Sequence, residues 1–297
     1  MGGGSLVLAA LLLGLPLLVF LAWWLLGVTE GALLGPRVVR WFYDKDARRY
    51  EAIKGFDARE ERDFLALPLF HRLGEGAGPQ ARVLDLATGT GRLPSALLEV
   101  PFFTGPIVGL DASGGMLGVA AERLAAWPGR VALLQATLPP LPFADAAFDA
   151  VCLMEALEFL PRRTAVLDEL LRVLAPGGIL LVSNRRGWER RLFLGHAEPP
   201  RAFEDRLRAL GFREVQTRPW QSYYDLVWAR KPGTARPRGA DDAPPWPGAL
   251  RCPRCGHVLH LRKPESLERT AAYLLTAVVL YIPANLLPVM STASVLG

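Results

Sequence analysis

Short apolar runs alternate with amphipathic segments through the middle of this chain. Residues 83–86 form one such run, interrupted by Asp85, and residues 107–110 form another after a segment long enough for a helix. Runs of this length, bounded by turn residues, are typical of buried strands. The spacing therefore predicts a strand, a helix and a second, parallel strand, which is the unit from which α/β sheets are built.

The same pattern continues to about residue 231. After the second strand it predicts a helix that opens at residues 111–113, a strand that ends at Gln135, a strand that begins at Phe148, a helix over 164–174, a strand over 179–183, a helix over 202–210 and two strands over 213–217 and 224–230. Strands that alternate with helices in this way predict an α/β fold.

Two glycines follow the first strand, and a carboxylate ends the second. Gly89 and Gly91 allow backbone conformations and a close ligand approach that a Cβ atom would block. Asp111 stands where βαβ nucleotide sites place an acid that accepts hydrogen bonds from ribose hydroxyls. Together these residues predict a nucleoside-containing cofactor at the carboxyl ends of parallel strands. A dinucleotide is disfavoured, because Pro94 occupies the position of the third glycine of that fingerprint.

Four segments, in this order and spacing, resemble the class I S-adenosylmethionine-dependent methyltransferases, particularly their small-molecule and lipid branch. They are VLDLATGTGR (83–92), VGLDAS (108–113), LPFADAAFDAV (141–151) and ELLRVLAPGGILLVS (169–183). The resemblance covers about residues 42–231. It implies a Rossmann-like seven-stranded sheet with an antiparallel last strand, S-adenosyl-L-methionine as cofactor, and methyl transfer to a small-molecule or lipid-like acceptor.

The resemblance also implies which residues bind the cofactor. The matching positions are Asp85, Ala87, Thr88, Gly89, Gly91, Asp111, Ala112, Met116, Gln135, Ala136 and Thr137. Asp85 would anchor the amino group of the methionine part through the turn, and Asp111 would hold the ribose. The chain departs from the family at two positions. Ala87 replaces a common glycine, and Thr137 replaces a common aspartate near the adenine amine, so that contact would be a weaker neutral hydrogen bond.

The sequence does not identify a catalytic base. Methyl transfer is an in-line displacement that depends chiefly on positioning, so an acid-base pair is not obligatory. Glu155 and Glu158 follow the fourth strand and are the candidates for a general base or an acceptor ligand; the alternative is that both are solvated. Residues 41–44 and Tyr50 resemble the family's variable cap, which closes over the cofactor and selects the acceptor.

Residues 1–29 contain no charged side chain and are predicted to be a transmembrane anchor, because about 20 apolar residues span a bilayer as a helix. The alternative, a cleaved signal peptide, is disfavoured by the missing basic start and the length of the run. The basic residues that follow are Arg37, Arg40, Lys45, Arg48 and Arg49. This flank predicts that the domain over residues 30–231 faces the cytoplasm, at the inner membrane of a bacterium.

Residues 232–250 have the composition of a linker, and residues 251–297 form a separate segment. Residues 251–290 resemble the start of a paraquat-inducible protein A membrane module, with a second transmembrane helix predicted over residues 271–290. Cys252 and Cys255 have the spacing of half a zinc site, which is either an incomplete metal site or a turn that binds no metal. This tail implies an alternative function, as a non-catalytic cofactor-binding or assembly subunit of a membrane transport system with transport partners.

The formal charge of +5 and the sequence pI of about 9.4 raise the question of a nucleic-acid partner. The basic residues lie near the amino end and over residues 185–208, without the interleaved aromatic residues of a nucleic-acid module. We therefore expect a membrane and a small-molecule or lipid acceptor as partners, and no nucleic acid. Three cysteines do not form a disulfide framework, which agrees with a reducing cytosol.

Overall fold

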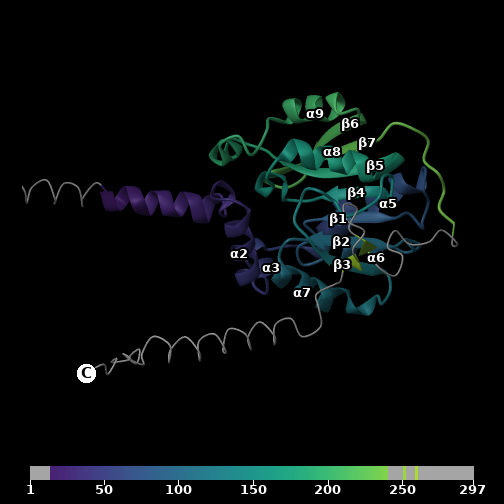
Figure 1. Cartoon of the computed structure of the whole chain (residues 1–297), viewed down its shortest axis with the longest axis horizontal. Helices are drawn as coiled ribbons and strands as arrows, with labels where there is room; N and C mark the ends of the chain where they lie inside the picture. Colours follow the sequence, from purple (N-terminus) through teal and green to yellow (C-terminus); the bar gives the residue numbers. More distant parts are fainter. Residues whose placement is uncertain (1–13, 240–249, 252–257, 260–297) are drawn as a thin grey trace, which may run out of the picture. The chain divides into compact units, whose positions relative to one another are not determined.

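A seven-stranded sheet forms the centre of the computed structural model, which describes residues 14–239, 250–251 and 258–259 (Figure 1). Its strands are β1 (Val83–Leu86), β2 (Ile107–Asp111), β3 (Val131–Gln135), β4 (Phe148–Leu153), β5 (Leu174–Arg185), β6 (Arg213–Pro219) and β7 (Tyr224–Arg230). Their order is β3-β2-β1-β4-β5-β7-β6. The first five strands are parallel, and β7 runs antiparallel to both of its neighbours. The predicted α/β fold and antiparallel last strand are confirmed. A separate ladder pairs β8 (Leu250–Arg251) with β9 (Val258–Leu259).

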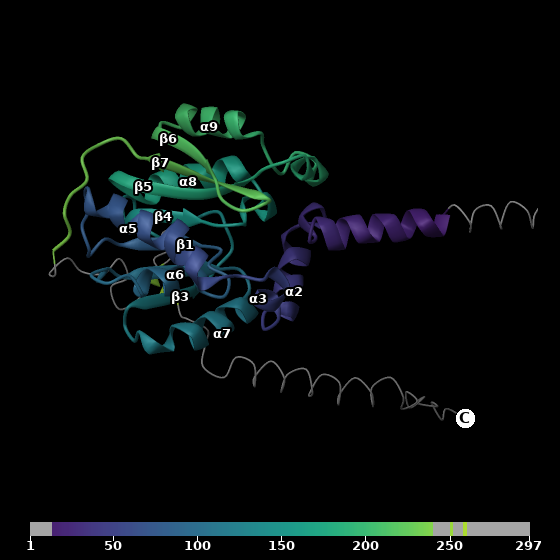
Figure 2. The same ribbon diagram turned by 180° about the vertical axis from the view of Figure 1, so that it is seen from behind.

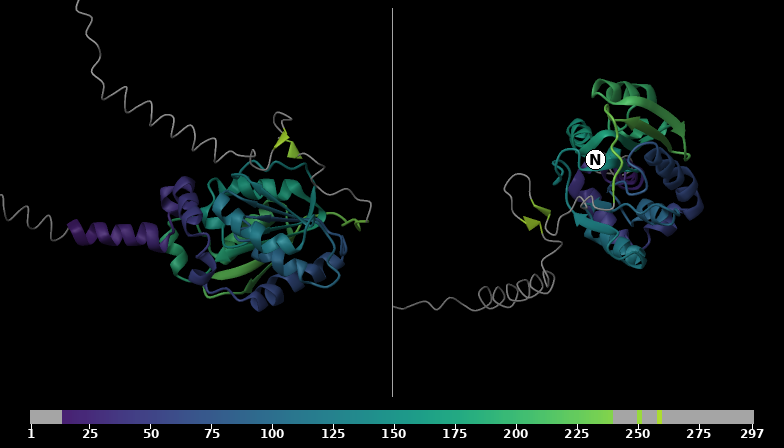
Figure 3. Two further views of the ribbon diagram at one scale, coloured as in Figure 1. Left: turned by 90° about the horizontal axis from the view of Figure 1, so that it is seen from below. Right: turned by 90° about the vertical axis from the view of Figure 1, so that its right-hand side faces the viewer.

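Helices cover both faces of the sheet (Figures 2 and 3). The α-helices of five residues or more that follow residue 30 are α2 (Pro36–Asp46), α3 (Tyr50–Lys54), α5 (Leu67–Gly74), α6 (Arg92–Leu98), α7 (Gly114–Arg123), α8 (Arg163–Val173) and α9 (Pro200–Ala209). Short turns of helix are η1 (Trp23–Val28), η2 (Ala32–Leu34), α4 (Ala58–Glu60), η3 (Glu61–Ala66), η4 (Leu124–Ala126), η5 (Leu157–Phe159) and η6 (Glu189–Phe193). Buried residues of α8 and α9 share one core with the sheet, and those of α5, α6 and α7 share the other.

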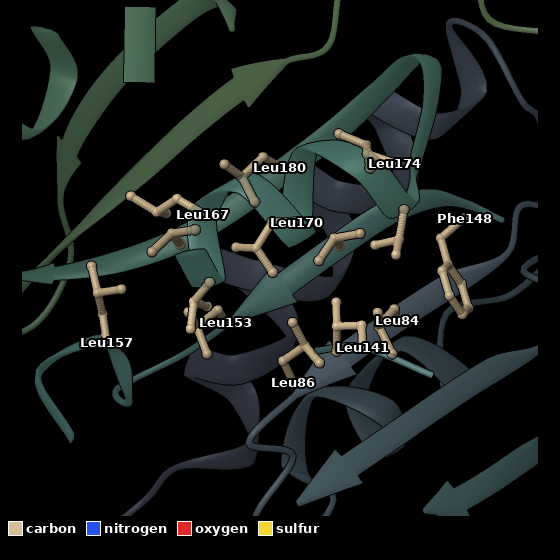
Figure 4. Packing of buried hydrophobic residues seen from close by; sticks show 14 of the residues in the cluster. Leu84, Leu86, Leu141, Phe148, Leu153, Leu157, Leu167, Leu170, Leu174 and Leu180 are labelled. Atoms are coloured by element: carbon tan, nitrogen blue, oxygen red, sulfur yellow. The ribbon is translucent and has the colours of Figure 1, made fainter. Parts of the chain in front are cut away.

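The two cores follow from the alternation of side chains along the strands. Val151 and Leu153 of β4 point into the core beneath α8, whereas Ala150 and Cys152 point into the opposite core. Figure 4 shows the first core, in which Leu170 of α8 lies among leucines of the sheet. Because both faces are covered, the central strands β1, β2 and β4 are mainly apolar, and that pattern is what predicts them from the sequence.

β5 is longer than the pattern predicts. It begins at Leu174 rather than residue 179, and α8 accordingly ends at Val173. The extra length arises because the backbone N–H of Gly177 donates to the carbonyl of Lys231, and the N–H of Lys231 donates to the carbonyl of Gly178. Gly177 has φ +73°, and a Cβ atom there would lie 2.3 Å from the backbone nitrogen of Ala235. The glycine is therefore required where the chain bends within this strand.

Residues 14–22 are helical and continue into η1. Large apolar side chains of this helix are exposed, with 54–65% of the residue accessible at Leu15, Leu17, Leu18, Val19, Phe20 and Trp23. The indole N–H of Trp24 donates to the carbonyl of Leu192 over 3.2 Å. Among the described residues, no helix combines the length and hydropathy needed to cross a bilayer. Residues 1–13 and 271–290 lie outside the described part, so both transmembrane helices remain predictions.

Candidate active site

The turn between β1 and α6 is built from left-handed backbone. Ala87, Gly89 and Gly91 have φ values of +51°, +55° and +76°. A Cβ atom on Gly91 would lie 3.0 Å from a methyl group of Leu124 and 3.2 Å from the Cβ atom of Ala120, so only glycine allows this close packing against α7 and η4. Ala87 adopts the same region at an energetic cost, and strained backbone of this kind is typical of ligand-binding turns.

Asp111 lies at the carboxyl end of β2 and faces this turn. Its Oδ2 accepts a hydrogen bond from the backbone N–H of Gly89 over 2.8 Å, and its Oδ1 accepts one from Ser113, also over 2.8 Å. Burial raises the pKa of the Asp111 carboxyl, and the backbone hydrogen bonds oppose that shift. A carboxylate has about four acceptor positions, so about two stay open after these bonds form. The carboxylate is therefore fixed in place and still able to accept from two hydroxyls.

A cavity of about 590 Å³ opens at the carboxyl ends of the strands. Eight of the residues implicated by sequence line it: Ala87, Gly89, Asp111, Ala112, Met116, Ala136, Thr137 and Glu155. Its other walls come from α2, from Tyr50 and from residues 138–139, 154–156 and 159–162. Its volume lies within the range of small-molecule sites in proteins. The fold thus brings most of the predicted cofactor residues to one cavity.

A smaller cavity of about 50 Å³ shares Ala87, Gly89 and Glu155 with the larger one. It is lined by charged side chains of which three are acidic, Glu61, Asp85 and Glu155, and one is basic, Arg92.

Arg92 connects two of these acids. Its Nη2 donates to Glu61 over 2.5 Å and to Glu155 over 3.2 Å. The second oxygen of Glu61 and the Nε of Arg92 are buried without a hydrogen-bond partner among the described residues. Burial raises the pKa of Glu61, and the neighbouring Arg92 opposes this. Two residues that line the small cavity therefore each keep a buried polar atom without a partner, an acceptor on Glu61 and a donor on Arg92.

Asp85 is the most buried acid of this cavity, with 3% of the residue exposed. Its Oδ2 accepts a hydrogen bond from the hydroxyl of Thr88 over 2.6 Å. Burial raises the pKa of the Asp85 carboxyl to about 7, although the Thr88 hydroxyl and the charge of Arg92 act in the opposite direction. A cation placed beside Asp85 would favour its ionised form.

Three predicted residues lie outside the walls of both cavities. Glu158 accepts from Arg185 Nε over 2.6 Å and from the Tyr224 hydroxyl over 2.5 Å, in a buried ion pair. Gln135 donates to the carbonyl of Ala112 over 3.1 Å and thereby braces the segment that follows β2. Gly91 contributes by allowing the turn to pack closely against Ala120 and Leu124.

The predicted metal ligands, Cys252 and Cys255, fall outside the described residues. Within the part of the chain that the structure describes, no group of three or more histidine, cysteine or acidic residues is placed to hold a metal ion.

Sequence reasoning missed several residues of the site. Glu61 comes from η3, in a segment rich in charge of both signs that gives no signal for a buried acid. Arg92 is the first residue of α6 and directly follows the glycine turn. Its place next to that turn is the sequence feature that could have identified it as a site residue. Tyr43, by contrast, belongs to the predicted cap segment 41–44; it lines the large cavity, and its hydroxyl donates to Glu30 over 2.8 Å.

Comparison with known proteins finds similarity to methyltransferases. Residues 84–182 match a family described as a methyltransferase domain. Similar curated proteins include the ubiquinone/menaquinone biosynthesis C-methyltransferase UbiE of Rhizobium leguminosarum bv. trifolii, which is 33% identical over 147 residues, 49% of this chain and 57% of that protein. The protein of the same name from Ectopseudomonas mendocina is 39% identical over 109 residues, 36% of this chain and 43% of its own. The chain spans about half the length of these relatives.

Solved structures show the same fold. The [4+2]-cyclase SpnF has a TM-score of 0.52 at 21% identity and covers 67% of this chain and 97% of its own. A Haemonchus contortus phosphoethanolamine N-methyltransferase 2, in complex with phosphomonomethylethanolamine and S-adenosylhomocysteine, has a TM-score of 0.50 at 17% identity, over 64% of this chain and 58% of its own. At these identities the likeness concerns the fold, and the chemistry has to be argued from the site.

Proposed function

We propose that the protein is an S-adenosylmethionine-dependent methyltransferase that methylates an apolar small-molecule or lipid-like acceptor at a membrane surface; the match of residues 84–182 to a methyltransferase domain supports this. One observation carries the proposal. The fixed carboxylate of Asp111, with acceptor positions to spare, lies in the wall of a cavity of about 590 Å³. That cavity is large enough for a cofactor and an acceptor to lie side by side.

The charged groups of the small cavity suit the methionine end of the cofactor. The unpaired Oε2 of Glu61 needs a donor, and the unpaired Nε of Arg92 needs an acceptor. A bound amino acid zwitterion supplies an ammonium for the first and a carboxylate for the second. With the ribose on Asp111, the two cavities would then hold adjoining parts of one molecule, since they share the turn residues Ala87 and Gly89.

The remaining walls of the large cavity are mainly apolar. Val39, Leu138, Phe159 and Leu160 are among the residues that line it. When bound, the cofactor supplies the methyl group and the leaving group, so the protein has chiefly to align the acceptor and exclude water. Besides Asp111, the acid that lines the large cavity is Glu155. Its backbone N–H donates to the Ser183 hydroxyl over 2.5 Å. We propose that Glu155 orients the acceptor's nucleophile.

The acceptor class is tested by incubating the full-length protein with methyl-labelled S-adenosylmethionine and a total bacterial lipid extract. We expect the label in an organic-soluble molecule, and we expect the Asp111→Ala variant to leave that molecule unlabelled. Label that appears only in water-soluble products would contradict the apolar acceptor. An absence of label with every fraction, despite normal cofactor binding, would contradict the catalytic function itself.

We further propose that the protein is held at the cytoplasmic face of a bacterial inner membrane. The exposed apolar side chains of residues 14–26 support this, as do the basic residues that begin with Arg37. Removing residues 1–28 and 251–297 together should move the protein from the membrane fraction to the soluble fraction. Removing either segment singly should leave it with the membrane, because the other remains. Sedimentation and immunoblotting measure the distribution, and membrane association after the double removal would contradict helix anchoring.

A further inference from the structure

We infer that the methyl acceptor is an anionic amphiphile, whose phosphate or carboxylate group is bound by Arg37, Arg40 and Arg162 in the wall of the 590 Å³ cavity. The inference rests on the proposed function and names the substrate class of the same site. We call these three side chains the arginine mouth, because they are the exposed basic residues among those that line the cavity.

The arginine mouth is assembled from two separate segments. Arg37 and Arg40 are three residues apart on α2, so they project on the same side of that helix. Arg162 precedes α8 and has φ +51°, a left-handed conformation that is uncommon for a residue with a Cβ atom. All three residues are exposed and line the same cavity. An anion there would meet guanidinium groups from two sides.

The charges of the arginine mouth are uncompensated. No ion pair or side-chain hydrogen bond joins Arg37, Arg40 or Arg162 to any residue that the structure describes. Asp44, the acid one turn after Arg40, accepts instead from the hydroxyl of Ser113 and the N–H of Gly115. An exposed arginine can be merely solvated, but three that line one cavity provide several guanidinium donors for an anion with more than one acceptor oxygen.

The cavity is lined by two acids as well as by the arginine mouth. Its acids are Asp111, which is fixed by backbone N–H groups, and Glu155, which is paired with Arg92. An acceptor with one anionic end would be attracted to the arginine mouth and repelled by the acids. That arrangement directs its uncharged end toward the cofactor.

Apolar residues of the large cavity support an amphiphile as the methyl acceptor. Val39, Leu138 and Leu160 line the same cavity as the arginine mouth. A small hydrated anion would leave these side chains in contact with water, whereas a hydrocarbon chain or ring would cover them. The combination of guanidinium groups and apolar side chains therefore favours a molecule that has both an anionic group and an apolar body.

Calorimetric titration of the full-length protein tests this with four probes below their micellar concentrations: decyl phosphate, decanol, decyltrimethylammonium and inorganic phosphate. We expect decyl phosphate to bind most tightly, and we expect its affinity to fall as salt is raised. The double variant Arg37→Gln/Arg40→Gln should weaken decyl phosphate binding by roughly tenfold or more, since hydrogen bonds to charged groups are lost. Arg162 belongs to another segment of the same site, so Arg162→Gln should also weaken decyl phosphate binding.

The matched control is Arg59→Gln/Arg201→Gln. Both residues are exposed, neither has an ion pair or side-chain hydrogen bond with a described residue, and neither lines the cavity. This control loses the same net charge and should bind decyl phosphate like the natural chain. Equal binding of decanol and decyl phosphate, or equal loss in the control, would overturn the inference. Inorganic phosphate binding as tightly as decyl phosphate would overturn its amphiphile part. S-adenosylmethionine binding, titrated separately, reports on the proposed function.

Discussion

Replacement of Asp111 by alanine should lower the affinity for S-adenosylmethionine by roughly 100-fold or more, because two hydrogen bonds to a charged group are worth at least ~3 kcal/mol together. The reason is geometric. The N–H groups of Gly89 and Ser113 already hold the carboxylate, so its open acceptor positions are oriented before the ribose arrives. Little ordering is then needed on binding. Isothermal titration calorimetry measures the loss.

Two further variants test whether the loss depends on the charge of Asp111 itself. Asp111→Asn keeps the size of the side chain and one acceptor oxygen, so its affinity should lie between those of the natural chain and the alanine variant. Asp63→Asn removes an exposed acid that pairs with Arg62 at the surface and should bind the cofactor normally. Melting without cofactor checks that each variant folds. If a folded Asp111→Ala protein bound the cofactor with unchanged affinity, Asp111 would have no place in the site.

Asp85→Asn should make the cofactor-free protein more stable at pH 8 and leave it nearly unchanged at pH 4. Burial raises the pKa of this carboxyl from 3.8 to about 7. The folded protein therefore holds the proton more tightly than the unfolded chain does, and it loses stability as pH rises from about 4 to about 7. At about 1.4 kcal/mol per pH unit, the loss is ~4 kcal/mol. The asparagine side chain stays neutral and therefore avoids this loss of stability, while its oxygen still accepts a hydrogen bond from the Thr88 hydroxyl.

Urea denaturation of both proteins at pH 4, 6 and 8 measures this difference, and groups common to both proteins cancel. Added S-adenosylmethionine should reduce it at pH 8, because a cation beside Asp85 stabilises the ionised carboxylate and has no such effect on asparagine. The exposed-acid variant Asp63→Asn should follow the natural chain at every pH. A constant gap between the natural chain and Asp85→Asn across the three pH values would show that Asp85 does not titrate in this range.

The strands and the glycine turn were predictable because each depends on local sequence. β1 has the bounds expected from its apolar run, and β2 ends at Asp111 as predicted. A sheet covered on both faces needs mainly apolar strands, so the burial of the central strands can be predicted from the sequence. The position of Asp111 follows in turn, because a residue that ends a parallel strand lies at the carboxyl edge of the sheet.

The remaining parts of the site depend on contacts between distant segments. Glu155 and Glu158 are three residues apart and equivalent by sequence, yet one lines both cavities and the other pairs with Arg185 and Tyr224. Arg37 and Arg40 were interpreted only as the basic flank of a membrane segment, although the same residues line the cavity. A charge pattern on a helix does not reveal which surface faces a ligand until the partner elements are known.

The connection between the apolar helix and the cavity wall is short. Residues 29–35 separate the end of η1 from the start of α2, the helix that carries Arg37 and Arg40. Seven residues extend over at most ~25 Å. Under the proposed membrane anchoring, an acceptor dissolved in the same lipid layer would reach the enzyme by lateral diffusion. Turnover would follow the mole fraction of acceptor among the lipids rather than its amount per litre.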